Sequence, residues 1–116
     1  MSFNEIGKDF LRVSSAHGFT TGAESLMHVA EKLMLVVDEV AEAHEEVRKV
    51  NGVEDLKNVY YLPSKPNKPE GFPIEIADAV IRLIQLASAL GIDLDEVVKL
   101  KNAYNETRPF RHGKNS

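Results

Sequence analysis

Residues 73–90, with the sequence PIEIADAVIRLIQLASAL, constrain the fold of this chain more than any other segment. In a helix each residue advances by about 100°, so the polar side chains of this segment share one narrow seam and apolar side chains occupy every other direction. The seam holds Glu75, Asp78, Arg82 and Gln85. A helix that is apolar almost all round is packed on several sides. The sequence therefore predicts a central, largely buried helix.

Three further helices are predicted from the spacing of apolar residues and from their end signals. Pro73 occupies a first-turn position and opens the central helix. Asp93 and Glu96 have the spacing of a capping box, and Pro109 forbids continuation of the last helix. The predicted helices span residues 3–17, about 23–50, 73–90 and 93–107.

The segment 53–72 is predicted to be a long irregular loop, with a short helical turn at 54–60. It contains three prolines, at positions 63, 66 and 69, followed by Gly71. No part of the chain shows the alternation typical of a strand. We therefore expect an all-α protein, a four-to-five-helix bundle formed by one domain over residues 1–116. A chain of 116 residues keeps a large surface share, so oligomerisation would help to complete its core.

Composition excludes several classes of function. The chain has no cysteine, which excludes disulfides, thiolate zinc sites and a cysteine nucleophile. The N-terminus lacks the pattern of a signal peptide, and no run of about 18 apolar residues is free of charge, so we expect a cytoplasmic protein without a membrane span. The net charge of −4 argues against nucleic-acid binding, although the tail after Arg108 is basic.

Carboxylates lie on the second and third helices, where burial is expected. Glu39 and Glu42 lie one turn apart at the edge of the apolar face, and Glu75 and Asp78 lie in the narrow seam. An unpaired buried carboxylate costs several kcal/mol. Arg82 can compensate one acid but not several, and a divalent cation with oxygen ligands can compensate the group. Surface acids, or ion pairs with Arg82 and Lys101, remain the alternative.

Other acids are expected to be ordinary surface groups. Glu45 and Glu46 are predicted to be solvated at the end of the second helix, near Arg48 and Lys49. The chain contains no Glu-x-x-His pair, no H-E-x-x-H motif and no EF-hand loop. Sites with carboxylate ligands alone suit Mg²⁺, with Mn²⁺ as the alternative, and they commonly hold substrate phosphates.

Cations on the predicted fourth helix fit such a phosphate. Lys101, Asn105 and Arg108 project within about 60° of one another, so they share one face. Lysine offers a point charge, and arginine offers a planar fork that matches phosphate oxygens. We therefore expect this face to bind phosphate groups.

Three motifs together resemble the MazG-like all-α nucleoside triphosphate pyrophosphohydrolases of the short, single-domain phage and bacterial type. The motifs are DEVAE at 38–42, EIAD at 75–78 and KNAYNETRPFRHGK at 101–114. The pattern of that family is E-E-x-x-E, a spacer, E-x-x-D and then Lys…Asn…Arg. Asp38 stands where the first glutamate usually lies, and the spacer is long. The resemblance covers roughly residues 17–114.

The resemblance implies Mg²⁺-dependent hydrolysis of a (deoxy)nucleoside triphosphate to the monophosphate and pyrophosphate, by attack of water on the α-phosphorus. It implies that Glu39, Glu42, Glu75 and Asp78 hold the metal, and that Asp38, Glu39 or Glu42 orients the water. It also implies a homo-oligomer, a dimer or a tetramer. The expected substrate-binding residues are Lys101, Asn105, Arg108, Arg82, His17, Phe19 and His112, with Tyr60 and Tyr61 as further candidates near the base.

Other functions stay open at this point. The chain could be a catalytically silent helical oligomer that binds nucleotide or metal. It could be a related pyrophosphohydrolase specific for dUTP or phosphoribosyl-ATP. Nucleic-acid binding rests only on the basic tail, and we expect neither nucleic acid nor membrane as a partner.

Overall fold

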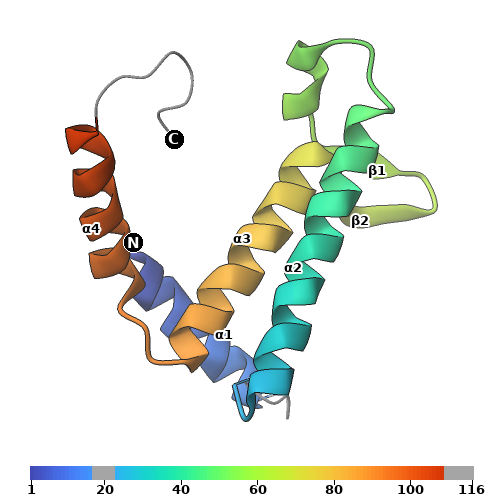
Figure 1. The fold of residues 1–116 in the computed structure, drawn as a ribbon. Helices are drawn as coiled ribbons and strands as arrows, with labels where there is room; N and C mark the ends of the chain where they lie inside the picture. The colour runs from blue at the N-terminus through green and yellow to red at the C-terminus, as the bar shows by residue number, and fades with distance from the viewer. Residues whose placement is uncertain (17–22, 109–116) are drawn as a thin grey trace.

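The computed structural model describes residues 1–16 and 23–108. Four α-helices are present in these ranges, together with one short 3₁₀ helix and one β-hairpin (Figure 1). The elements are α1 (Phe3–Ala16), α2 (Leu26–Val47), η1 (Val53–Lys57), β1 (Tyr60–Leu62), β2 (Lys65–Glu70), α3 (Phe72–Ala89) and α4 (Leu94–Thr107). The prediction of a mostly helical protein is confirmed.

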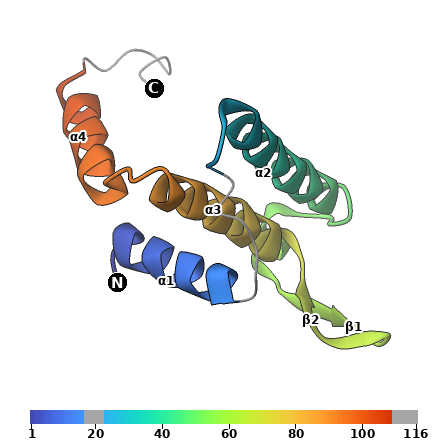
Figure 2. The same ribbon diagram turned by 90° about the horizontal axis from the view of Figure 1, so that it is seen from below.

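The predicted central position of α3 is also confirmed. Figure 2 shows α3 between α1 on one side and α2 on the other, and α2 and α3 run antiparallel in Figure 1. Ala79, Ile84 and Leu86 of α3 are buried, and Ala43 of α2 is buried with them. Ile76, Val80 and Leu83 of α3 are 43%, 44% and 45% exposed, so the predicted burial of this helix is only partly realised within one chain. Its polar seam lies along the contact with α2, where Arg82 meets Glu39.

Capping residues decide where the helices begin. The side chain of Ser25 accepts a hydrogen bond from the backbone N–H of His28 at 3.1 Å, so α2 begins at Leu26 rather than at residue 23. The Asp93 carboxylate accepts from the Glu96 N–H at 3.2 Å, which confirms the predicted start of α4. Pro73 lies in the first turn of α3, as expected.

The prediction of a strandless loop at 53–72 is wrong. After η1, which matches the predicted helical turn, β1 pairs antiparallel with β2, with Tyr60 opposite Glu70 and Leu62 opposite Lys65. The pairing leaves Pro63 and the next residue as the turn. The prolines of β2 are compatible with pairing because each strand of a two-stranded sheet has an open edge, where a missing N–H removes no ladder hydrogen bond.

Gly71 joins this hairpin to the first turn of α3. Its φ of 120° is a conformation that glycine adopts without strain. A Cβ atom at Gly71 would lie 2.7 Å from the carbonyl oxygen of Asn58, so the chain can approach itself closely only with glycine there. The hairpin is consequently held at the end of the α2–α3 pair.

α4 forms a separate arm. It contacts α1 and the nearby end of α3, and Figure 1 shows it diverging from α2 and α3. Its start is bound to the start of α1, because Asp95 accepts the N–H of Phe3 at 2.8 Å and Asn4 Oδ1 accepts the N–H of Leu94 at 2.9 Å. The N-termini of the two helices thus cap each other.

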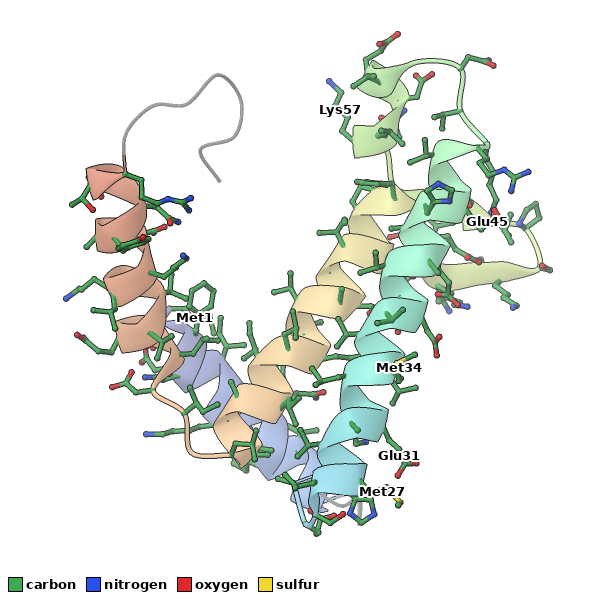
Figure 3. All side chains as sticks on the ribbon, viewed as in Figure 1. Met1, Met27, Glu31, Met34, Glu45 and Lys57 are labelled. Carbon is green, nitrogen blue, oxygen red and sulfur yellow. The ribbon has the colours of Figure 1, made fainter. Side chains whose placement is uncertain are left out.

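Many large apolar side chains remain exposed in the described residues. Met27 and Met34 are 74% and 58% exposed, and Figure 3 shows both on the side of α2 that points away from α3. Leu100 of α4 is 68% exposed. No helix in the described ranges has the length and apolar character needed to cross a membrane.

Candidate metal centre

Three of the four predicted metal ligands meet between α2 and α3. Glu39 of α2 and Glu75 and Asp78 of α3 each offer one carboxylate oxygen, and these oxygens lie within 4.8 Å of one another. The spacing follows from helix geometry, because Glu75 and Asp78 are three residues apart and lie on one face of α3. The side chain of Glu39 is only 12% exposed. The group is therefore partly shielded from water.

Glu42, the fourth predicted ligand, lies next to this group without being part of it. Burial, then repulsion and a side-chain hydrogen bond from Glu42, and then repulsion from Glu39 and Asp78 together raise the pKa of the Glu75 carboxyl from 4.5 to about 7. Two carboxyl groups can share a hydrogen bond only when one of them is protonated. The proton therefore resides on Glu75 below about pH 7.

Arg82 is the one cation of the described residues that is paired with this group. Its Nε donates to Glu39 Oε2 at 2.9 Å, one turn of α3 beyond Asp78. Glu75 and Asp78 form no ion pair within the described ranges. An ion pair therefore neutralises the charge of Glu39, whereas no ion pair in the described ranges neutralises Glu75 or Asp78.

The donor set fits a hard divalent cation. Carboxylate oxygens from three side chains are the ligands that Mg²⁺ and Mn²⁺ prefer, and the cluster has no nitrogen or sulfur donor. A bound cation would replace the proton that Glu75 otherwise takes up, because it supplies the positive charge that lets all the carboxylates ionise. Acidic groups also occur without a metal, so this chemistry identifies a candidate centre rather than a particular ion.

The predicted phosphate-binding residues of α4 lie on the separate arm. The Lys101 ammonium is 4.9 Å from the centre of the Tyr104 ring, and the Arg108 guanidinium is 5.7 Å from it, so both cations flank one aromatic side chain. Asn105 is exposed on the same helix. Their role in substrate binding stays a prediction.

The remaining predicted site residues are not brought into the cluster. Asp38 is exposed on α2 and is not a member of the three-acid group. His17, Phe19 and His112 lie outside the described residues.

The prediction of a solvated Glu46 is wrong. This side chain is buried at the C-terminal end of α2, where it accepts hydrogen bonds from the Tyr60 hydroxyl at 3.0 Å and from Lys49 Nζ at 2.8 Å. Glu46 follows Glu42 by four residues, so it continues the same acidic face. The burial depends on the hairpin, which delivers Tyr60, and no local pattern around Glu46 reveals that.

Comparisons with protein-family models, curated proteins and solved structures gave no match for this chain.

Proposed function

We propose that the chain is a Mg²⁺-dependent nucleoside triphosphate pyrophosphohydrolase, which converts a (deoxy)nucleoside triphosphate and water to the monophosphate and pyrophosphate. The observation that carries the proposal is the group formed by Glu39, Glu75 and Asp78, together with the raised pKa of Glu75. Several partly buried acids with one arginine partner among the described residues make a site that a divalent cation stabilises. The resemblance of the three motifs supplies the substrate class.

In this proposal Glu39, Glu75 and Asp78 hold Mg²⁺, with Mn²⁺ as the alternative. When bound, the cation neutralises triphosphate charge and lowers the pKa of a bound water. Arg82 keeps Glu39 in place through their 2.9 Å contact, and its remaining N–H groups can donate to phosphate oxygens.

Glu42 is the best candidate for orienting the attacking water. It lies next to Glu75 but outside the three-oxygen group, so its carboxylate is available to accept a proton. In the reaction the water oxygen forms a bond to the α-phosphorus, and the bond from that phosphorus to the oxygen bridging to the β-phosphorus breaks. The water's proton goes to Glu42, and pyrophosphate leaves. Asp38 and Glu42 are both exposed and outside the group, and Asp38 is the weaker candidate because only Glu42 is among the acids that act on Glu75.

The proposed enzyme is a homo-oligomer. Apolar side chains are exposed on the outer face of α2 and on α4, which is more surface of this kind than a soluble monomer usually leaves open. The arm formed by α4 diverges from α2 and α3, the helices that carry the acids (Figure 1). Association of two copies would cover the apolar faces and could bring Lys101 and Arg108 to phosphates held at either metal centre.

The test is release of pyrophosphate from a panel of nucleoside triphosphates with Mg²⁺. We expect hydrolysis by the wild type, and Asp78→Asn should lower kcat/KM by about 100-fold or more because a metal ligand is lost. Glu42→Gln should lower kcat by about 10²–10⁴-fold with little change in KM, as expected for a proton acceptor. Glu31→Gln is the matched control, since Figure 3 shows Glu31 on the far side of α2 from α3.

The outcomes separate the alternatives. Pyrophosphate release that survives in Asp78→Asn would exclude the acidic group as the catalytic centre. If no triphosphate is hydrolysed but nucleotide or Mg²⁺ binds, the chain is a silent binding protein. If a single substrate such as dUTP is consumed, the enzyme is a specific pyrophosphohydrolase of the kind considered above.

A further inference from the structure

A cavity of about 360 Å³ lies between the C-terminal end of α2, η1 and the start of α3. Its wall is formed by the C-terminal end of α2, by η1, by Tyr60 of β1 and by Gly71 and Phe72 at the start of α3. The volume is at the lower end of the roughly 300–1,000 Å³ typical of small-molecule sites. The role proposed above for the acidic group does not use this cavity.

The cavity adjoins the candidate metal centre along the same helices. Glu46, in its wall, follows Glu42 by four residues, and Phe72 precedes Glu75 by three. At 1.5 Å per residue, Phe72 lies about 5 Å along α3 from Glu75, whereas Glu46 lies seven residues, about 10 Å, along α2 from Glu39 of the acidic group. A ligand bound at the acids would have to extend about 5–10 Å along the α2–α3 pair to reach the cavity.

The polar groups of the cavity have a preformed arrangement. Glu46 is buried, and the Tyr60 hydroxyl and Lys49 Nζ donate to its two oxygens at 3.0 and 2.8 Å. Burial, and secondly the hydrogen bond to Glu46, raise the pKa of Tyr60, so the phenol stays protonated and keeps this contact. The Tyr60 contact ties the first residue of β1 to the C-terminal end of α2 in the cavity wall.

The charges of the cavity wall favour the nucleoside end of a nucleotide over its phosphate end. Glu46 and Asp55 bring carboxylates to the wall, while Lys49 is the one lysine among its residues. Phosphate groups would meet carboxylate repulsion there without a metal. A neutral nucleoside fits better, because Asn51 and Asn58 can both donate and accept hydrogen bonds, and Tyr60 and Phe72 provide apolar surface.

We propose that this cavity binds the nucleoside part of the triphosphate whose phosphates lie over Glu39, Glu75 and Asp78. The inference rests on the proposed function and adds the orientation of the substrate to it. The phosphates point toward the middle of the α2–α3 pair, and the base and sugar point toward the hairpin. Selection among bases then depends on Asn51, Asn58 and the residues around Glu46.

The test uses a variant in which a large side chain at an exposed position of the wall fills the cavity. Asn58 lies after η1 with φ −84° and ψ 132°, which any residue can adopt, so Asn58→Trp introduces a large ring without backbone strain. Asn67→Trp makes the same change in β2 at an exposed residue that does not line the cavity. Circular dichroism verifies that both variants are folded.

The measured quantities are KM for the best triphosphate and the inhibition constant of inorganic triphosphate, which has no nucleoside. We expect Asn58→Trp to raise KM by about tenfold or more while the inhibition constant changes by less than about twofold. Asn67→Trp should change neither. Tyr60→Phe is the second variant, and loss of its hydroxyl should raise KM in the same selective way.

Each result decides the proposal. If wild type hydrolyses triphosphates and Asn58→Trp leaves KM unchanged, or raises KM and the inhibition constant equally, the orientation is wrong and the proposed function stands. If wild type hydrolyses no triphosphate, the proposed function fails, and this inference fails with it.

Discussion

Glu75 shows at the scale of one residue how a helical position changes the chemistry of a carboxyl group. Its place in the seam of α3 brings it against Glu39, Glu42 and Asp78, and burial together with repulsion from these acids raises its pKa to about 7. An ordinary surface glutamate titrates near 4.3. Without a cation the folded protein therefore binds a proton at Glu75 that the unfolded chain has already released between about pH 4.5 and 7.

We predict a stability that falls as pH rises through this interval. The folded state binds more protons than the unfolded state there, so the free energy of unfolding of the metal-free protein decreases from about pH 4.5 to 7 and then levels off. Glu75→Gln removes this slope and should be more stable than wild type by about 1–2 kcal/mol at pH 8, with little difference at pH 4.5. Urea unfolding with a chelator measures both.

Mg²⁺ supplies the control for this prediction. Mg²⁺ added at pH 8 should raise the melting temperature of wild type and of Glu31→Gln, because a ligand that binds the folded state stabilises that state. The melting temperature of Glu75→Gln should rise less, because this variant has lost one carboxylate of the group. Equal pH profiles for wild type and Glu75→Gln would show that Glu75 is not the titrating group.

At the scale of elements, close helix contacts depend on small residues. Gly7 of α1 is buried against α3, and a Cβ atom there would lie 2.7 Å from Ser88 Cβ and 3.3 Å from Ile84 Cγ2. Real Cβ atoms do not approach one another so closely, so the α1–α3 distance would have to increase. Gly7 thus sets how closely α1 covers the central helix.

Gly7→Ala should destabilise the protein by about 1–3 kcal/mol, because overpacking outweighs the better helix propensity of alanine. In a Ser88→Gly background the same substitution should cost much less, since the opposing Cβ atom is absent. Chemical denaturation of the four variants of this double-mutant cycle measures the coupling. Lys8→Ala, one residue along on the exposed side of α1, serves as the control, and additive effects would contradict the contact.

At the scale of the whole molecule, apolar residues face outward on one side of α4. Val97, Leu100 and Tyr104 are spaced three and four residues apart, so they form one stripe, and they are 47%, 68% and 56% exposed. A stripe of this kind commonly marks an interface. α4 contacts α1 and one end of α3, and Figure 1 shows it apart from α2.

We predict that the proposed homo-oligomer depends on this stripe. Leu100→Lys should shift the protein toward monomer, because a lysine ammonium would be desolvated in the interface. Asn102→Lys introduces the same charge on α4, about 200° around the helix from Leu100, and should leave the oligomer intact. Light scattering after size-exclusion chromatography gives the mass. A wild type that is monomeric at every concentration tested would contradict the proposal.

The sequence by itself determined the helices and the position of most of the acidic group. Apolar periodicity, Pro73 and the Asp93 cap are local signals, and they correctly predict α3 as the central helix and the start of α4. The spacing of Glu75 and Asp78 places both on one helical face, because the 3.6-residue period is a property of the helix alone.

Only the tertiary structure decided the hairpin, the burial of Glu46 and the arm formed by α4. The prolines of residues 63–69 indicate a loop as long as the partner strand is unknown. Glu46 is buried because β1 brings the Tyr60 hydroxyl to it, and the two residues are fourteen positions apart in the sequence. The direction of α4 depends on the mutual capping of α1 and α4, in which Asn4 and Asp95 are 91 residues apart. Such contacts join residues that are distant in sequence, so they stabilise the protein only once the loops between those residues have closed. No local sequence pattern encodes them.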